Sequence, residues 1–217
     1  IKSIPSEMGT NWWRADQFHR RAVGLGPQWK SALPPKNSKE EQSDELEFNK
    51  IAWEFMINLG VMGHFVGDNG QPYHTTVDYD GYGNGHGGIH AYFEDTMVSA
   101  QGPELMMEII TEAKKLQKNR AKTSFLKNDS VIENMKQLGV QSFKEISQVN
   151  RIDKVMTPSS YKEEKGMALK TPAVRNDVDK MAPKFHSLIV KCMARSAALL
   201  AQIWDDAYIK VGRPALA

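Results

Sequence analysis

Five side chains that could bind a metal ion lie close together in this sequence: His64, Asp68, His74, His90 and Glu94. His64 and Asp68 are four residues apart, as are His90 and Glu94, so on a helix each pair projects from one face. Imidazole nitrogen and carboxylate oxygen together suit zinc, and three protein ligands with a position left for water form the usual catalytic zinc site. The spacing therefore predicts a metal site, with zinc as the first candidate.

A purely structural origin is the alternative explanation for these histidines. A lone histidine on an apolar helix often belongs to the core, and a His/carboxylate pair four residues apart is often a surface ion pair. However, four of the six histidines, His64, His74, His86 and His90, fall in this one stretch, and such clustering favours a metal site. His86 is the exception, because its glycine-rich surroundings predict a flexible, solvated loop histidine.

A long helix is expected to carry the first two candidate ligands. Apolar residues recur at intervals of three and four between residues 45 and 67, which predicts a buried helix with His64 and Asp68 at its C-terminal end. A turn at residues 69–72 would then bring His74 back towards them.

A glycine- and tyrosine-rich loop is expected at residues 75–89, before a short helix that carries His90 and Glu94. Gly87 and Gly88 can take backbone conformations closed to other residues, so the loop can turn tightly into the site.

The rest of the chain also predicts helices, and strand-like alternation is scarce. Ser38 with Glu41, in the polar connector 34–43, and Ser142 with Glu145 have the spacing of capping boxes. Residues 157–171 are polar and rich in lysine, which predicts a loop or flap. Further helices are expected at residues 12–24, 130–138, 142–150 and 181–207. Another helix is expected to start at Pro103, with a buried stripe formed by Leu105, Met106, Ile109, Ile110, Ala113 and Leu116. The prediction is a single all-α domain over residues 1–217.

Composition narrows the class of protein. A chain of 217 residues is long enough for one well-buried core and short for two domains, and 41% hydrophobic residues indicate a globular protein. The net charge of +2 does not suggest a strongly electrostatic nucleic-acid binder. The single cysteine, Cys192, is expected in the core. No stretch approaches the ~20 apolar residues of a membrane span, so no transmembrane segment is expected.

The candidate ligands occur in an order with a known parallel. The sequence reads H-F-V-G-D-x-x-Q-P-x-H from His64 to His74 and G-I-H-x-x-F-E up to Glu94. It resembles the zinc-dependent phospholipase C and S1/P1 nuclease superfamily, whose members carry a His-x3-Asp-x5-His segment and then a His-x3-Asp/Glu segment. The resemblance extends outward to Gly9, Thr10, Trp13 and Arg14, and to the Ala-Ala-Leu-Leu-Ala-Gln-Ile-Trp stretch of the last helix.

The resemblance implies a multi-helix fold and a cluster of three zinc ions that activates water and neutralises the phosphate of a phosphodiester. His64 would bind one ion of a close pair and Asp68 would bridge that pair. His74, His90 and Glu94 would hold the remaining ion, and this site is complete within the sequence. Because the family is exported, the resemblance also implies a secreted or periplasmic location.

Two departures from the family pattern concern the close pair. Relatives place a zinc-binding His directly before the Gly-Thr, where this sequence has Met8, and a thioether is a poor zinc ligand. Relatives also use a Trp, a His and an Asp further upstream, and none of these residue types precedes Met8 here. Either an upstream segment supplies these ligands or the pair is degraded. His19 is expected at the surface rather than as a replacement ligand.

The expected activity is zinc-dependent hydrolysis of a phosphodiester, in a nucleic acid or a phospholipid, by metal-activated water. Asp68 is the expected bridging ligand and the residue that orients this water. Two alternatives stay open: a binding protein that keeps the fold and one zinc, and a structural module in which zinc at His74, His90 and Glu94 ties the loop to the helices. Four tyrosines are expected either to face the substrate or to pack: Tyr73, Tyr79, Tyr82 and Tyr92.

Overall fold

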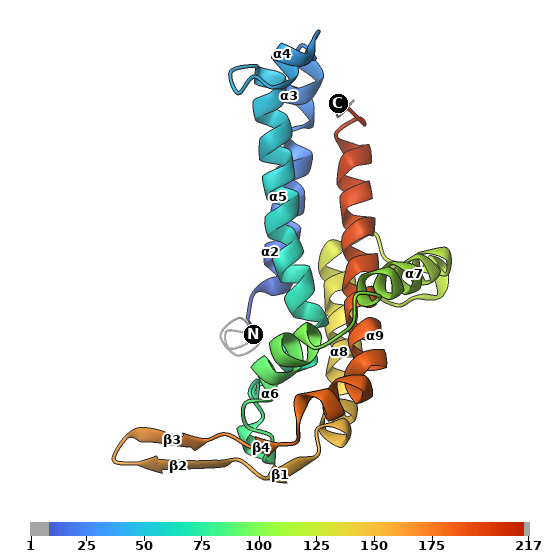
Figure 1. The fold of residues 1–217 in the computed structure, drawn as a ribbon. Helices are drawn as coiled ribbons and strands as arrows, with labels where there is room; N and C mark the ends of the chain where they lie inside the picture. The colour runs from blue at the N-terminus through green and yellow to red at the C-terminus, as the bar shows by residue number, and fades with distance from the viewer. Residues whose placement is uncertain (1–8, 215–217) are drawn as a thin grey trace.

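Long helices form the body of the molecule in the computed structural model, which describes residues 9–214. α2 (Asn11–Gly24) lies alongside α5 (Glu47–Gly70), while α8 (Val131–Ile152) and α9 (Val178–Lys210) pack against this pair and α7 (Leu105–Lys118) packs on α9 (Figure 1). Helix accounts for 67% of the structure and strand for 7%, so the predicted predominance of helix is confirmed.

Short helical segments connect these long helices. Their bounds are α3 Gly26–Ser31, α4 Ser38–Glu41, η1 Pro72–Thr75, η2 Tyr82–Asn84, α6 Ile89–Ala91, η3 Tyr92–Met97 and η4 Arg120–Lys122. η3 is a π-helix that continues directly from α6. α4 is capped by Asn37, whose side chain accepts hydrogen bonds from the backbone amides of Lys39 and Glu40, so the cap is not the predicted Ser38.

Two apolar clusters form the core, and α9 contributes to both. Its C-terminal half packs with α2 and α5, where the apolar positions of α5 are buried at the predicted spacing: Phe48, Ile51, Phe55, Leu59, Met62 and Val66. Its N-terminal half packs with η1, α6, η3 and the end of α8, through Phe185, Leu188 and Ile189. Cys192 belongs to this second cluster, as expected.

α8 is one continuous helix, so the prediction of two helices at 130–138 and 142–150 was wrong. Ser142 is buried within it and donates hydrogen bonds to the carbonyls of Leu138 and Asn69. Glu145 is buried as well and pairs with Arg195 and with a lysine of α9 rather than capping a helix. A Ser that bonds to the carbonyl four residues earlier fits inside a helix, which is why the apparent capping box does not interrupt α8.

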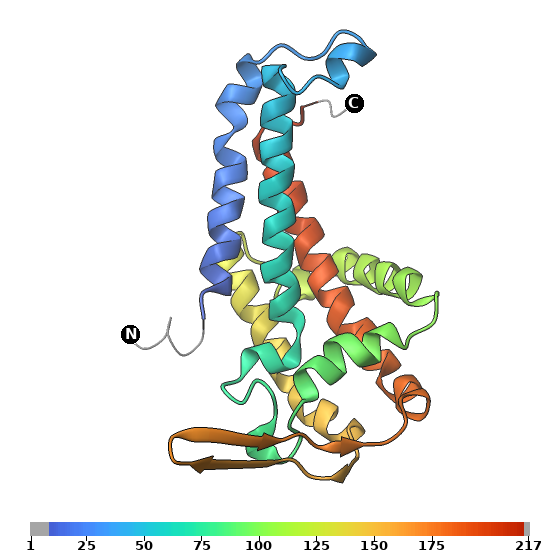
Figure 2. The same cartoon turned by 60° about the vertical axis from the view of Figure 1, so that its left-hand side comes forward.

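Residues 157–171, predicted as a loop or flap, consist mainly of strands. β2 (Ser160–Glu164) and β3 (Met167–Thr171) pair as an antiparallel hairpin, and β1 (Val155–Thr157) pairs with β4 (Val174–Arg175) at its base. Lys165 and Gly166 make the turn with φ of 51° and 76°, and two positive φ values are typical of a tight hairpin turn. The hairpin projects away from the helical body (Figure 2).

The buried face of α7 differs from the prediction. On α7, Ile109 and Ala113 are buried, but Met106 is 62% exposed and Ile110 is 37% exposed, so the buried stripe is narrower than expected.

α9 is the one helix within residues 9–214 that is long and apolar enough to cross a membrane, since an 18-residue window has a mean hydropathy of 1.2. Within the molecule, 44% of this window is buried, and a core helix meets the same criteria, so the support for a membrane span is weak.

Candidate metal centre

The C-terminal end of α5 presents the first pair of candidate ligands. His64 and Asp68 lie one turn apart, as predicted, with His64 Nε2 3.3 Å from Asp68 Oδ2. The neighbouring Asn69 fixes this end of the helix, because its side chain accepts a hydrogen bond from Trp12 Nε1 and donates one to the carbonyl of Met135. α5 is thereby joined to both α2 and α8 immediately beside Asp68.

The chain turns directly after α5 and returns His74 to the same place. Buried Gln71 organises the turn, since its side chain accepts a hydrogen bond from the amide of Tyr73 and donates one to Glu94 Oε2 at 3.2 Å. His74 Nδ1 faces Asp68 Oδ1 at 3.9 Å. The opposite ring nitrogen of His74 points towards the second pair of candidate ligands.

The glycine-rich loop and α6 position that second pair. Gly88 begins α6 with a φ of 84°, a backbone conformation that favours glycine. His90 is held by the preceding loop, because Tyr79 places its carbonyl 3.3 Å from His90 Nδ1 and Asp80 accepts a hydrogen bond from the backbone amide of His90. Glu94 follows one turn later, with Oε1 3.0 Å from His90 Nε2.

Three side chains converge as the sequence predicted. His74 Nε2 is 3.2 Å from His90 Nε2 and 3.3 Å from Glu94 Oε2, and the two imidazole rings stack with centroids 4.6 Å apart. Ligand atoms arranged tetrahedrally at about 2.0–2.1 Å from a zinc ion would be about 3.3 Å from one another. Glu94 faces His90 through Oε1 and His74 through Oε2, and one ligand atom from each of the three residues lies within 4.8 Å of the others, which is close enough for the three to share one ion.

The surroundings of the three side chains also suit metal binding. Burial lowers the pKa of His74 below its ordinary value, which favours the neutral imidazole that a metal requires. Metal-binding histidines usually make a second contact through the nitrogen that faces away from the ion, and a carboxylate or backbone carbonyl is the common partner. Asp68 lies on that side of His74 and the Tyr79 carbonyl on that side of His90.

His64 and Asp68 lie beside this group rather than within it. Among residues 9–214, the group of His74, His90 and Glu94 is the one set of three or more such side chains close enough to share an ion. The side chain of His64 is 69% exposed, whereas that of Asp68 is 26% exposed. Met8, the position of the expected family ligand, lies outside the described residues.

A cavity of about 240 Å³ opens next to the candidate centre. Asp68 and Glu94 form part of its wall, and the remaining wall is mostly apolar and comes from η3 and α9, including Phe93, Ile189 and Met193. A reacting group could therefore lie against the carboxylates while an attached organic group occupies an apolar space.

Two predictions about histidines outside the group were wrong. His86 is not solvated, because its side chain is 15% exposed and Nδ1 lies 2.9 Å from Oδ2 of Asp153. His19 is buried too, and its Nε2 lies 2.8 Å from Oδ2 of Asp206. In both cases the partner carboxylate lies far away in sequence, so local composition could not reveal it.

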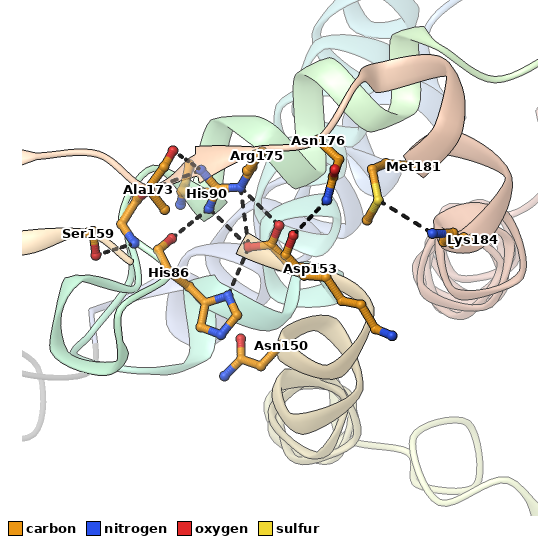
Figure 3. Close-up of polar contacts among 12 residues, drawn as sticks. His86, His90, Asn150, Asp153, Ser159, Ala173, Arg175, Asn176, Met181 and Lys184 are labelled. Carbon is orange, nitrogen blue, oxygen red and sulfur yellow. Dashed lines mark hydrogen bonds and ion pairs between the residues drawn. The ribbon is translucent and has the colours of Figure 1, made fainter. Parts of the chain in front are cut away.

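Arg175 and Asp153 form a structural contact that no local sequence pattern indicates. The side chain of Asp153 is 1% exposed and receives hydrogen bonds from Arg175 Nε and Nη2, both at 3.0 Å (Figure 3). Arg175 also donates to the carbonyls of His86 and Gly87 at 2.7 and 3.1 Å. This group, the Arg175 cluster, ties the glycine-rich loop to the end of α8 and to β4.

The four tyrosines divide into two pairs. Tyr73 is buried and donates a hydrogen bond to Asn150, and the ring of Tyr92 lies beneath the guanidinium of Arg175, 4.6 Å away. Tyr79 is 55% exposed, and both Tyr79 and Tyr82 line a second cavity. Only the second pair is placed to meet a ligand.

Comparisons of this chain with protein-family models, with curated proteins and with solved structures give no match.

Proposed function

We propose that this protein is a zinc-dependent phosphodiester hydrolase. The observation that supports the proposal most directly is the convergence of His74, His90 and Glu94, each of which offers one ligand atom within 4.8 Å of the others. The cavity that begins at Asp68 and Glu94 gives a substrate access to the same place. The order of these residues in the sequence resembles that of the phospholipase C and S1/P1 nuclease superfamily. This resemblance is the reason for proposing a phosphodiester as the substrate.

In the proposed reaction, His74, His90 and Glu94 would hold the ion. Zinc bound there would lower the pKa of a water molecule towards ~7 and polarise the phosphoryl oxygen. Gln71 and the Tyr79 carbonyl keep Glu94 and His90 in the required orientation. Asp68 faces the other nitrogen of His74, on the side away from the ion, but shares a cavity wall with Glu94. We assign its carboxylate the role of orienting a water in that cavity and accepting its proton.

A cysteine nucleophile is disfavoured even though Cys192 lines the same cavity. Burial raises the pKa of the Cys192 thiol to about 12. The thiolate is the reactive form of cysteine, so this thiol is a poor nucleophile at neutral pH. Direct attack by water on phosphorus needs no covalent intermediate and suits the side chains present.

The test compares zinc content and turnover in His90→Ala and in a matched control, His186→Ala. His186 also contacts a carboxylate, with Nε2 2.7 Å from Glu108 Oε2, but it lies on α9 away from the candidate centre. We expect wild type and the control to retain zinc by mass spectrometry and to hydrolyse bis(4-nitrophenyl) phosphate. His90→Ala should lose both. Equal zinc content in wild type and His90→Ala would contradict the proposed centre.

A binding protein that keeps one zinc is the second candidate. It is favoured by the exposure of His64 and by the presence of only one complete three-residue group within the described residues 9–214. The two candidates differ in turnover. A zinc-loaded protein that hydrolyses neither bis(4-nitrophenyl) phosphate, nor single-stranded nucleic acid, nor phosphatidylcholine would support the binding protein.

A further inference from the structure

A second cavity, of about 360 Å³, lies between the glycine-rich loop and the β2–β3 hairpin. We call it the hairpin cleft. The loop contributes residues 77–80, Tyr82 and Gly83, and the hairpin contributes Tyr161 and Lys170. Three of these side chains are tyrosines, one is a lysine and two are aspartates, so the cleft combines aromatic surfaces with charges of both signs.

The register of the hairpin explains why its two contributing side chains meet. Tyr161 and Lys170 are directly opposite each other in the antiparallel pair, so both project from the same face. Lys170 Nζ lies 4.9 Å from the ring centroid of Tyr82 on the facing loop. Lys162, the next residue along β2, projects from the other face and does not line the cleft.

The hairpin cleft lies next to the candidate metal centre. Tyr79 belongs to both, because its ring centroid is 5.5 Å from that of His90 and its carbonyl lies 3.3 Å from His90 Nδ1. The two aspartates in the cleft wall are engaged with backbone amides: Asp78 accepts from Gly83 at 3.0 and 3.1 Å, and Asp80 accepts from His90 at 3.4 Å. The cleft therefore borders the outer side of His90, one imidazole ring away from the candidate metal centre.

Contacts at the base of the hairpin hold the two walls together. The amide of Ser159 donates to the Gly85 carbonyl at 2.9 Å, and the Ser159 hydroxyl accepts from the amide of Gly87 at 2.8 Å (Figure 3). The amide of Ala173 donates to the Gly87 carbonyl at 3.0 Å, beside the Arg175 cluster. Since both hairpin ends are fixed to the loop, the cleft is formed before a ligand arrives.

We propose that the hairpin cleft binds a nucleotide of a single-stranded nucleic acid. Its base stacks on Tyr79 and Tyr161, and its phosphate pairs with Lys170, which places an adjoining phosphodiester at the metal centre. Aromatic surfaces beside a cation are the usual means of binding single strands without sequence preference. Val77 is the one aliphatic side chain in the lining, so the cleft offers no continuous apolar wall for an acyl chain. The inference rests on the proposed function for its substrate class, but it makes a separate statement about binding.

The test measures binding of a fluorescent phosphorothioate oligothymidylate, which resists hydrolysis, by fluorescence anisotropy on the full chain. Lys170→Ala and Tyr161→Ala should each weaken binding by about 10-fold. Lys162→Ala is the matched control, because it removes the same charge from the opposite face of the same hairpin, and it should bind as wild type does. Lys170→Ala should also reduce the salt dependence of log K by about 0.7, as expected for one lost phosphate contact.

Each outcome separates this inference from the proposed function. Equal loss of binding in Lys170→Ala and Lys162→Ala would overturn the cleft, since the effect would be general electrostatics. Loss of binding to phosphatidylcholine vesicles in Tyr161→Ala, with unchanged oligonucleotide binding, would assign the cleft to lipid instead. Hydrolysis of bis(4-nitrophenyl) phosphate should be unchanged in the control Lys162→Ala. If that hydrolysis is missing in wild type while oligonucleotide binding follows the predicted pattern, the proposed function fails and the cleft stands.

Discussion

Replacing Asp153 by Asn should destabilise the protein strongly, because it removes the only negative charge within the Arg175 cluster while keeping the size of the side chain. Asp153 is 1% exposed and the side chain of Arg175 is 10% exposed, so water cannot take over the lost contacts. Two arginine nitrogens and His86 Nδ1 lie within 3.0 Å of the Asp153 carboxylate. Breaking a buried pair from one side typically costs about 3–5 kcal/mol.

The expected size of the effect can be read from thermal unfolding followed by circular dichroism. For a chain of this length, 1 kcal/mol shifts the Tm by about 2–4 °C, so Asp153→Asn should lower it by about 6–20 °C. Glu112→Gln is the matched control. Glu112 also lies 3.0 Å from a cation, Lys115, but both side chains are largely exposed, and such pairs contribute about 0–1 kcal/mol.

Burial, rather than the distance between the charges, is the basis of this prediction. A Tm for Asp153→Asn within about 4 °C of that for Glu112→Gln would refute it. Such a result would mean that Arg175 finds water or another acceptor once the charge is removed. The cluster would then be no more than a surface ion pair, and it would not hold the glycine-rich loop against α8.

Further predictions concern the contact between α5 and α9, the pH dependence of stability and the single thiol. Gly70→Ala should be less stable than Gly67→Ala by about 1 kcal/mol in urea unfolding. A Cβ at residue 70 would lie 1.8 Å from Ser196 Oγ, which must rotate away, whereas a Cβ at residue 67 of the same helix meets nothing within 4 Å. Burial alone would raise the pKa of Glu145, but hydrogen bonds from α9 outweigh it and the pKa lies below its ordinary value of 4.5. The ionised Glu145 carboxylate therefore stabilises the fold above pH 4.5, and this stabilisation is lost as the pH falls through the pKa of the folded state. Wild type should lose more stability than Glu145→Gln between about pH 5 and pH 3. Cys192, with its pKa raised to about 12, should not react with a thiol reagent at pH 8 until urea unfolds the chain.

The pairing of the candidate metal ligands was predictable because each pair is a local feature. His64 with Asp68 and His90 with Glu94 need only one helical turn to share a face, and the apolar spacing of α5 already indicated that turn. The convergence of His74 with the second pair was an inference from a turn and a resemblance. In the structure, the Gln71 side chain and the loop carbonyls provide the contacts that bring it about.

The failures share a different cause. The spacing of Ser142 and Glu145 predicts a helix cap, because neighbouring residues do not reveal the distant partner of Ser142, the Asn69 carbonyl. Residues 157–171 predict a loop or flap rather than strands, because the side chains of the hairpin are exposed on both faces and no apolar alternation marks it. Pairing between strands, rather than burial, makes residues 160–171 regular.

The sequence alone determined the helical class, the long helix that ends at the candidate centre, and the residue types able to bind zinc. Those properties follow from repeats of three and four residues and from side-chain chemistry, which act over short stretches of chain. Only the tertiary structure decided that His86 and His19 are buried, that Asp153 and Arg175 fix the loop, and that Tyr161 and Lys170 face Tyr82. These contacts join residues far apart in sequence, and whether two such residues meet depends on how the whole chain packs rather than on the types of their neighbours.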